Sequence, residues 1–372
     1  MRFSAEVFAV EDTTMQLTWR GAPAGPVTIA VTDGRSTRHL EAIGESGPGA
    51  LIVDELEADT EYRVTATPKG AEAGRPRRFR TLATLPGAEL TRLSTISDIH
   101  IGERWFGMLP RIFERPEPAV PHTLRCATAA IEEWTRWGAQ HVVFKGDLVN
   151  HGTRAEWDTL ASLLATVPQP WTLMLGNHET MKSDRERAED MLTELGLPTA
   201  PVRTTDLPGL RIVLVETAID DHGHGRIRDA AAAADAVGET ELPCLVVIHH
   251  HIQRLPVPTF WPPGVESISG NRFVRELRRA NPKIVITSGH SHRHRRRLID
   301  GVPHVEVGSV KDYPGVWAGY AVHESGLRQV VRRVSPSDCL QWTDKTRGVM
   351  LGAWQAFSPG SLTDRCYIHR WI

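Results

Sequence analysis

Five short segments of the 372-residue chain place oxygen and imidazole donors directly after apolar runs. In chain order they read SDIH, GDLVNHG, GNHE, IHHH and GHSH. They contribute two carboxylates, one amide and four imidazoles: Asp98, Asp147, Asn177, His100, His249, His290 and His292. Such a mixture suits a pair of hard or borderline divalent cations. Because the set contains no thiolate, Mn, Fe, Zn, Mg and Co are all admissible.

The chemistry that such a site performs best is the hydrolysis of phosphate esters. Two cations roughly 3.5–4 Å apart can hold a hydroxide between them and clamp the phosphoryl oxygens during in-line attack. Asp147 is the natural bridge between the ions, and we predict that catalysis depends on it. His178 follows the predicted ligand Asn177 and can protonate the leaving oxygen or stabilise its charge. The predicted partner is therefore a small phosphate-ester substrate.

Donors from distant segments can meet only where several strands end at one edge of a sheet. Apolar runs of strand length are found before the donors and between them, at residues 93–96, 141–144, 171–175, 211–215, 245–248 and 284–287. Continuous β-branched runs indicate strands that are buried on both faces. In α/β sheets the carboxyl ends of such strands form the binding site. We therefore expect two packed sheets with helices on the outside.

Helices are predicted between these strands. Over residues 122–137 the side chains of Leu124, Ile131 and Trp134 lie on one side of a helix. The segments at residues 153–156 and 183–186 both have the pattern of a capping box that opens a helix. These helices would supply the outer layers of the α/β part.

The first 84 residues have a different rhythm, with short alternating strands broken by Gly, Pro and Asp. This pattern is typical of an antiparallel, immunoglobulin-like β-sandwich. The last part of the segment resembles the end of a fibronectin type III module, with Tyr62 in its late strand. We therefore divide the chain into a sandwich at residues 1–84, an α/β domain at 90–334, and a C-terminal extension at 335–372 that packs on the α/β domain.

The composition limits the kind of partner and the compartment. With 43 basic and 45 acidic residues the net charge is −2, so we expect neither nucleic-acid binding nor membrane association. The four cysteines form no CxxC pair and fit buried thiols in a reducing compartment. The chain starts with acidic residues where a signal peptide would need an apolar core. We expect a cytoplasmic protein, and the sequence leaves its oligomeric state open.

The ordered set D-x-H, G-D, G-N-H-[D/E], H and G-H-x-H resembles the calcineurin-like metallophosphoesterase family, from residue 93 to about residue 310. The resemblance implies a four-layer αββα sandwich with two divalent metal ions. It assigns one ion to Asp98, His100, Asp147 and His292, and the other to Asp147, Asn177, His249 and His290. It also makes His178 the histidine that faces the substrate, with Glu179 orienting it.

Two positions depart from the purple acid phosphatases, which also carry a fibronectin-like N-terminal domain. Those enzymes have glycine where this chain has His100, and tyrosine where it has Asn150. An iron–tyrosinate centre is therefore not expected. His100 makes the chain more similar to the phosphodiesterase and generic phosphoesterase branches. Phosphodiester cleavage is our first prediction and phosphomonoester cleavage the second, and the choice between them lies in pocket walls that no motif encodes. A third reading is a scaffold protein with a vestigial site, against which the intact ligand set argues.

Several polar residues near the motifs keep two readings each. His250 and His251 either contact the substrate or are supporting or exposed residues, and His151 either contacts the substrate or is a plain loop residue before a helix. The arginine-rich run at residues 293–297 either attracts an anion or forms an exposed strand. The loop at residues 101–121 either covers the cleft or is a plain surface excursion.

Overall fold

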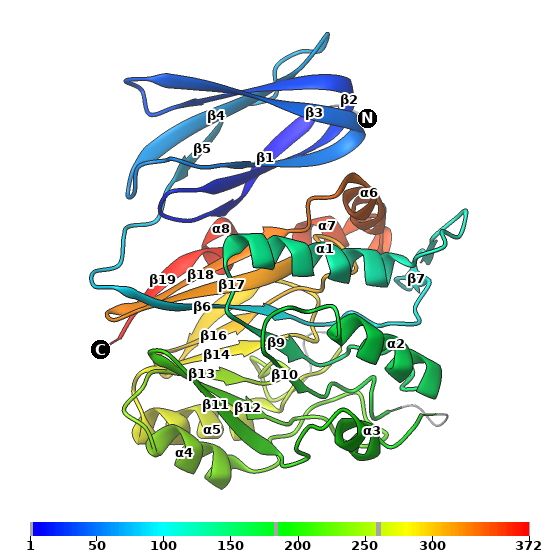
Figure 1. Cartoon of the computed structure of the whole chain (residues 1–372), viewed down its shortest axis with the longest axis vertical. Coiled ribbons are helices and arrows are strands. Elements are labelled where there is room, and N and C mark those ends of the chain that lie inside the picture. Colours follow the sequence, from blue (N-terminus) through cyan, green and yellow to red (C-terminus); the bar gives the residue numbers. More distant parts are fainter. Residues whose placement is uncertain (1–2, 182–184, 258–261, 372) are drawn as a thin grey trace.

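The computed structural model describes residues 3–181, 185–257 and 262–371 (Figure 1).

The N-terminal strands form one antiparallel sheet. The strand order is β1 (Ser4–Val10), β2 (Met15–Thr32), β4 (Glu61–Pro68) and β5 (Arg77–Arg80), and β3 (Thr37–Val53) also pairs with β2. All of these pairings are antiparallel. The prediction of a β-rich N-terminal region is confirmed.

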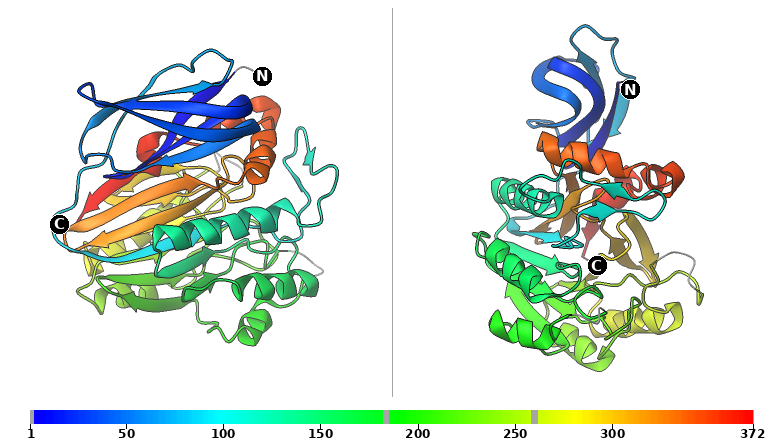
Figure 2. Two further views of the ribbon diagram at one scale, coloured as in Figure 1. Left: turned by 45° about the horizontal axis from the view of Figure 1, so that its top comes forward. Right: turned by 90° about the vertical axis from the view of Figure 1, so that its right-hand side faces the viewer.

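This sheet curls because its two longest strands, β2 and β3, bend together. The register between them shifts between Trp19 and Ala22, and Figure 2 shows the ribbon turning back on itself there. The curl buries alternate apolar side chains such as Val27 and Ile29. A Cβ atom on Gly49 would lie 2.4 Å from the Trp19 indole, so only glycine lets that ring pack flat against β3.

Two further sheets of six strands each carry the rest of the chain. The first has the order β10 (Trp171–Met174), β9 (His141–Lys145), β6 (Glu89–Ile96), β17 (Val316–His323), β18 (Gly326–Arg333) and β19 (Tyr367–Arg370). The second has the order β11 (Val202–Leu207), β12 (Leu210–Val215), β13 (Cys244–Val247), β14 (Ile284–Ser288), β16 (Val302–Glu306) and β15 (Arg295–Ile299). The strands that precede the predicted donors are parallel to their neighbours within each sheet, apart from the β6–β17 pair, so their carboxyl ends lie on common edges.

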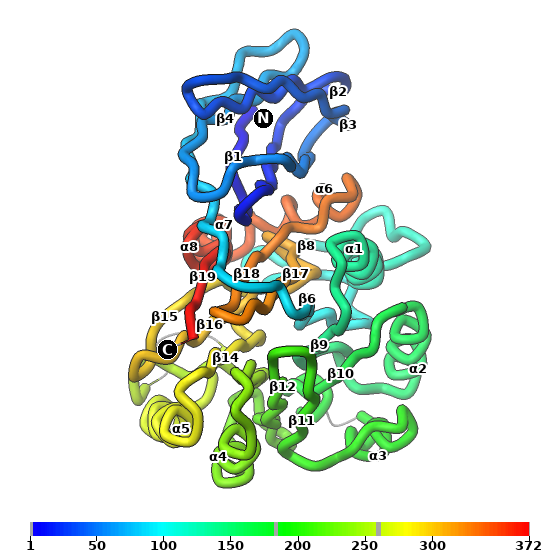
Figure 3. The backbone as a smooth tube through the Cα atoms, turned by 60° about the vertical axis from the view of Figure 1, so that its left-hand side comes forward, coloured from blue at the N-terminus to red at the C-terminus, as the bar shows by residue number. Residues whose placement is uncertain are grey.

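The second sheet is buried on both faces. In β12, Ile212 and Leu214 join the core that contains the first sheet, whereas Val213 and Val215 join a separate core with the helices. Those helices are α4 (Ala230–Gly238) and α5 (Ser267–Ala280), which cover the outer face of this sheet (Figure 3). The alternation explains why the sequence of these strands is continuously apolar.

Helices on the first sheet follow the predicted positions. Helix α1 (His122–Trp137) packs Trp134 and Trp137 edge-on against Phe144 and Trp317. Helix α2 (Arg154–Leu164) begins with the predicted capping box at Thr153. The other predicted box, at residues 183–186, lies partly outside the described residues, and α3 (Ala188–Glu194) begins just after it.

The elements after the first motif and after β18 are short. A small hairpin, β7 (Trp105–Phe106) and β8 (Ile112–Phe113), interrupts the loop after the first motif. After β18 come α6 (Ser337–Thr346), η1 (Met350–Gly352), α7 (Trp354–Phe357) and α8 (Leu362–Arg365), and the chain then adds β19 to the sheet edge. Among the described residues, no helix is long and apolar enough to cross a membrane.

The N-terminal sheet is fixed to the first six-stranded sheet by buried polar contacts. The Gln16 side chain donates to the Arg333 carbonyl at 2.8 Å and accepts from its N–H at 2.9 Å. Glu11, which is 4% exposed, forms ion pairs with Arg328 and Arg332 and accepts a hydrogen bond from the Trp137 indole. The two parts therefore meet through a polar interface as well as an apolar one.

Glu11→Gln should destabilise the protein by about 3 kcal/mol, because it leaves the half-buried Arg332 without its carboxylate partner and removes one of the carboxylates paired with the buried Arg328. Burial opposes the charge of Glu11, but Arg332 and Arg328 outweigh it and lower the pKa below its usual 4.5. The stabilisation should therefore be complete above pH 4.5 and disappear as the pH falls through the lowered pKa. Urea unfolding at several pH values measures both effects.

The matched control is Glu41→Gln, since Glu41 is exposed on β3. Equal unfolding free energies for the two variants at neutral pH would contradict a stabilising role of Glu11.

Candidate metal centre

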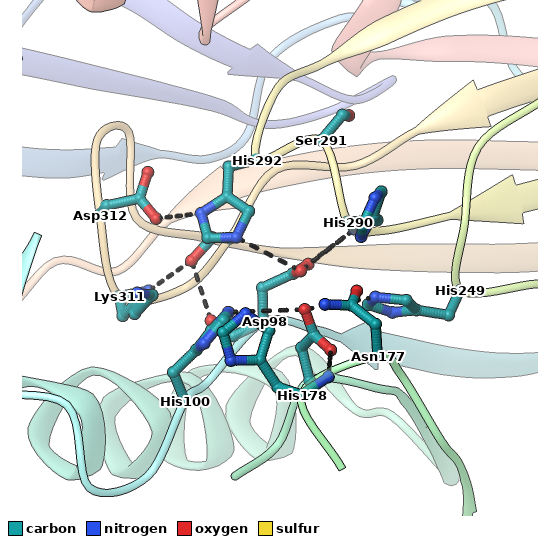
Figure 4. Close-up of polar contacts among 12 residues, drawn as sticks. Asp98, His100, Asn177, His178, His249, His290, Ser291, His292, Lys311 and Asp312 are labelled. Atoms are coloured by element: carbon teal, nitrogen blue, oxygen red, sulfur yellow. Dashed lines mark hydrogen bonds and ion pairs between the residues drawn. The ribbon is translucent and has the colours of Figure 1, made fainter. Parts of the chain in front are cut away.

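The seven predicted ligands meet at one edge of the paired sheets (Figure 4). Asp98 follows β6, Asp147 follows β9 and Asn177 follows β10, all from the first sheet. His249 follows β13, and His290 and His292 follow β14, from the second sheet. The site therefore lies across the junction of the two sheets, which holds its two halves together.

Asp147 lies at the centre of the cluster. Its Oδ2 atom is 3.3 Å from His249 Nε2 and 3.7 Å from His100 Nε2. On the other side, Asp98 Oδ1 is 3.4 Å from His292 Nε2 and accepts the backbone N–H of His290 at 3.1 Å. Asp98 and Asp147 also belong to one group of donors, together with His249, whose ligand atoms lie within 4.8 Å of one another.

The backbone at these ligands is in an unusual conformation. Positive φ angles between 51° and 67° occur at five of the seven predicted ligands: Asp98, His100, Asp147, His290 and His292. Residues other than glycine rarely adopt this left-handed region, although Asp and His tolerate it better than most. Such strain persists where the surrounding structure fixes the chain, and it is concentrated at functional sites. The convergence of the ligands is therefore maintained against local backbone preference.

Four ligand atoms in the described part of the chain are buried without a hydrogen-bond partner: His100 Nε2, Asn177 Oδ1, His249 Nε2 and His290 Nδ1. Burying a polar atom without a partner is costly, so such atoms are rare in folded proteins. Other buried polar atoms of the described residues also have no partner, but these four belong to ligands that meet at one edge of the sheets. The arrangement is what a site for cations requires, because a bound cation would satisfy these lone pairs.

In three of the predicted ligand histidines, one ring nitrogen lies within hydrogen-bond distance of an oxygen acceptor, and this contact fixes the tautomer. His249 Nδ1 is 2.7 Å from the Lys145 carbonyl oxygen, and His290 Nε2 is 3.2 Å from that of Pro263. His292 Nδ1 is 2.6 Å from Asp312 Oδ2. Because a carbonyl or carboxylate oxygen only accepts, each of these nitrogens carries the proton. The other ring nitrogen is then available to a metal ion.

Charge in the cluster is balanced by its histidines. Burial disfavours the ionised forms of Asp98 and Asp147, but neighbouring histidines outweigh it and lower the pKa of both carboxyls. Burial likewise opposes the charge of His249, yet the Asp147 carboxylate beside it raises its pKa to about 9.

Glu179 has a different role from the predicted one. Its carboxylate accepts four backbone N–H groups, from Asp147, Leu148, Val149 and Gly176, at 2.6–3.0 Å. The expectation that it orients His178 is wrong, because the ring of His178 bonds through Nδ1 to the Asn150 carbonyl at 2.8 Å. Glu179 instead fixes the loop that presents Asp147.

His178 lies beside Asp147 and His100 at the cavity above the ligands. Its backbone N–H donates to Asp147 Oδ1 at 2.9 Å, and its ring meets that of His100 edge-on, with centroids 4.2 Å apart. The side chain is half-buried and lines a cavity of about 580 Å³ above the ligands. With Nδ1 bonded to a carbonyl, Nε2 is the nitrogen left to interact with a substrate.

The neighbouring histidines separate into different environments. His250 is buried with Nδ1 2.9 Å from the Thr217 hydroxyl, and it forms a candidate ligand group with His249 and His290. His151 lines the cavity above the ligands. His251 stacks on the ring of His290 with centroids 5.9 Å apart, and it lines a second cavity of about 170 Å³ with Arg293, Arg295 and Arg297.

Sequence reasoning missed three residues beside the site. Lys311 forms a buried ion pair with Glu103 at the cavity wall, and Asp312 holds the ring of His292. Lys311 and Asp312 follow β16 in the loop to β17, a segment with no ligand motif of its own. Their position could have been inferred only from knowing that this loop passes the ligand edge of the sheets.

Comparison with known proteins places this geometry in a family. The model of the calcineurin-like phosphoesterase family matches residues 92–294. A glycerophosphodiester phosphodiesterase of Enterobacter lignolyticus is 24% identical over 155 residues, which cover 41% of this chain and 55% of that protein. A cAMP/cGMP dual specificity phosphodiesterase of Mycobacterium tuberculosis is 26% identical over 182 residues, which cover 46% and 54%. The chain thus spans about half the length of these curated relatives.

Among solved structures, a purple acid phosphatase from yellow lupin (Lupinus luteus) seeds covers 89% of this chain and 72% of its own, with 12% identity and a TM-score of 0.49. The matched range contains all seven predicted ligands. Since the matched segment is more than half of the 372 residues, this chain belongs to the calcineurin-like phosphoesterase family.

Proposed function

We propose that the protein is a metal-dependent phosphodiesterase that uses a dinuclear centre. The observation that carries this proposal is the set of buried, unpartnered ligand atoms that surround Asp147. One cation would be held by Asp98, His100, Asp147 and His292, and the second by Asp147, Asn177, His249 and His290. When bound, two such ions supply Lewis acidity and an activated water for attack on phosphorus.

The protein's own residues would orient the substrate and manage the proton. Asp147 would fix the spacing of the two ions, while Glu179 keeps its loop from moving. His178, oriented by the Asn150 carbonyl, would donate a proton or a hydrogen bond to the leaving oxygen through Nε2. Asp312 would keep His292 in the tautomer that binds metal.

A diester is favoured over a monoester as the substrate. A cavity of about 580 Å³ above the ligands has room for both ester groups of a diester. His100 in the first motif and the phosphodiesterase names of the curated relatives also support the choice. The identity of the two divalent ions, whether Mn, Fe, Zn, Mg or Co, is left to measurement.

The same proposal covers the architecture and the location. We infer a four-layer αββα domain at residues 90–334, with a C-terminal extension at 335–372 packed on it. We further infer that residues 1–84 are a fibronectin type III-like sandwich. All four cysteines are buried as free thiols, which supports a cytoplasmic location.

Asp147→Asn should reduce bound metal from about two ions per chain to less than one, because it removes the shared carboxylate. Turnover of bis-p-nitrophenyl phosphate should fall by roughly 100-fold or more, beyond the loss expected for a supporting residue. Elemental analysis together with a diester and a monoester assay measures both. The surface variant Asp158→Asn is the control, and full activity of Asp147→Asn would refute a bridging role.

His178→Ala should retain its metal but lose about 10²–10⁴-fold in kcat, since it removes only a proton donor. The loss should be greatest for alkyl leaving groups, which need protonation most, and smallest for p-nitrophenolate. A leaving-group series with metal content determined in parallel tests this. The exposed residue His222 provides the matched control variant, His222→Ala. Loss of metal from His178→Ala would mean that the residue is a ligand.

A further inference from the structure

The cavity above the ligands has apolar walls, although its floor is polar. One wall, which we call the apolar roof, consists of Trp105, Phe106, Val349 and Trp354. Met181, Pro262 and Pro263 also line the cavity. The charged and hydrogen-bonding groups of the cavity are mainly the predicted ligands, His178 and the Glu103–Lys311 pair. A substrate would thus meet cations at the floor and hydrocarbon at the sides.

The apolar roof is a fixed part of the fold. Val349 and Trp354 pack with Tyr313 in a small core of their own, against which Phe106 rests. The Phe106 ring stacks on that of His292 with centroids 5.9 Å apart, and Trp354 lies 5.8 Å from Phe106. The Trp354 indole donates to Asp312 at 3.3 Å, the same carboxylate that holds His292. The roof is therefore positioned by the metal-site residues themselves.

Beyond the roof, the rim of the cavity exposes large apolar side chains. Met108, Leu109, Met350 and Leu351, which we call the apolar lip, are 69%, 70%, 53% and 91% exposed. The two halves of the lip are joined by a hydrogen bond from Leu351 N–H to the Leu109 carbonyl at 3.1 Å. Met108 and Met350 line the cavity, and Leu109 and Leu351 extend the exposed apolar surface from them along the chain. Such an exposed apolar patch is characteristic of a ligand-binding surface.

The backbone of the lip supports the same reading. Met350 and Leu351 have φ angles of 55° and 56°, in the left-handed region that side chains other than Asn, Asp and His rarely adopt. Packing does not explain this strain, because Leu351 is almost fully exposed. Backbone strain of this kind is concentrated at functional sites such as ligand clamps.

Resting on the proposed function, we infer that the substrate is a phosphate ester with an extended apolar group, such as an alkyl chain. The phosphate would lie on the predicted metal ligands at the floor of the cavity. The first part of the alkyl group would lie against Phe106 and Trp354, and its end would lie across Met108 and Met350. Burial of each methylene would add hydrophobic binding energy along the path. The roof and the lip are then the residues that determine substrate specificity.

A series of alkyl p-nitrophenyl phosphates, from methyl to octyl and below their micelle concentrations, isolates this effect because the leaving group stays constant. In the metal-loaded protein, kcat/KM should rise by roughly threefold for each added methylene until the cavity is full. The double variant Met108→Ser, Met350→Asn should lose most of this rise, since asparagine tolerates the left-handed region while removing the apolar surface. Ile268→Ser, at an apolar residue 67% exposed on α5, is the control and should keep the rise.

Calorimetric titration with methylphosphonate and hexylphosphonate tests the inference without turnover. The hexyl compound should bind metal-loaded protein at least about 30-fold more tightly than the methyl compound, and the double variant should reduce that ratio. Equal affinities and a flat kcat/KM series would overturn the inference. If no ester is hydrolysed while the affinities still rise with chain length, the proposed phosphodiesterase function fails and the apolar binding site stands.

Discussion

The position of one buried carboxylate, that of Asp147, is the constraint on which the site depends. A carboxylate in this interior position must be held close to cationic partners, because an unpaired buried charge is very costly. Glu179 supplies the restraint, collecting N–H groups from both the loop after β9 and the loop after β10. A Cβ atom on Gly176 would come within 2.2 Å of Asp147, so glycine is required where the two loops touch. The carboxylate of Glu179 thus joins the loops after β9 and β10, which present the centre of the site.

The remaining ligands are positioned by the sheets and by strain in the loops. Because the strands of each sheet fix the starting points, each donor needs only a short excursion, and several of these excursions pass through the left-handed region. His249 and His290 belong to the second sheet. Apolar side chains on one face of that sheet pack against the first sheet, and those on the other face pack against helices, so the two histidines are held beside the ligands of the first sheet. The energy of folding this apolar interior therefore maintains a polar cluster that is unfavourable when its lone pairs have no partner.

The features set by short stretches of sequence, such as strand ends and helix starts, could be predicted from the sequence. Polar donors after apolar runs identified the ligand edge, and the capping pattern before Arg154 identified the start of α2. The partner of Glu179 could not be predicted, because its four N–H donors are set by how two loops fold against each other. Asp312 and Lys311 were also missed, since they reach the site from a segment whose sequence has no donor pattern. Contacts between distant loops depend on the packing of the sheets, which local periodicity does not encode.

The most direct test of the account is anomalous diffraction from crystals of the protein saturated with Mn²⁺. The account predicts two peaks roughly 3.5–4 Å apart, with Asp147 coordinating both and His249 and His292 on opposite ions. A single peak, or none among these side chains at saturating metal, would contradict it.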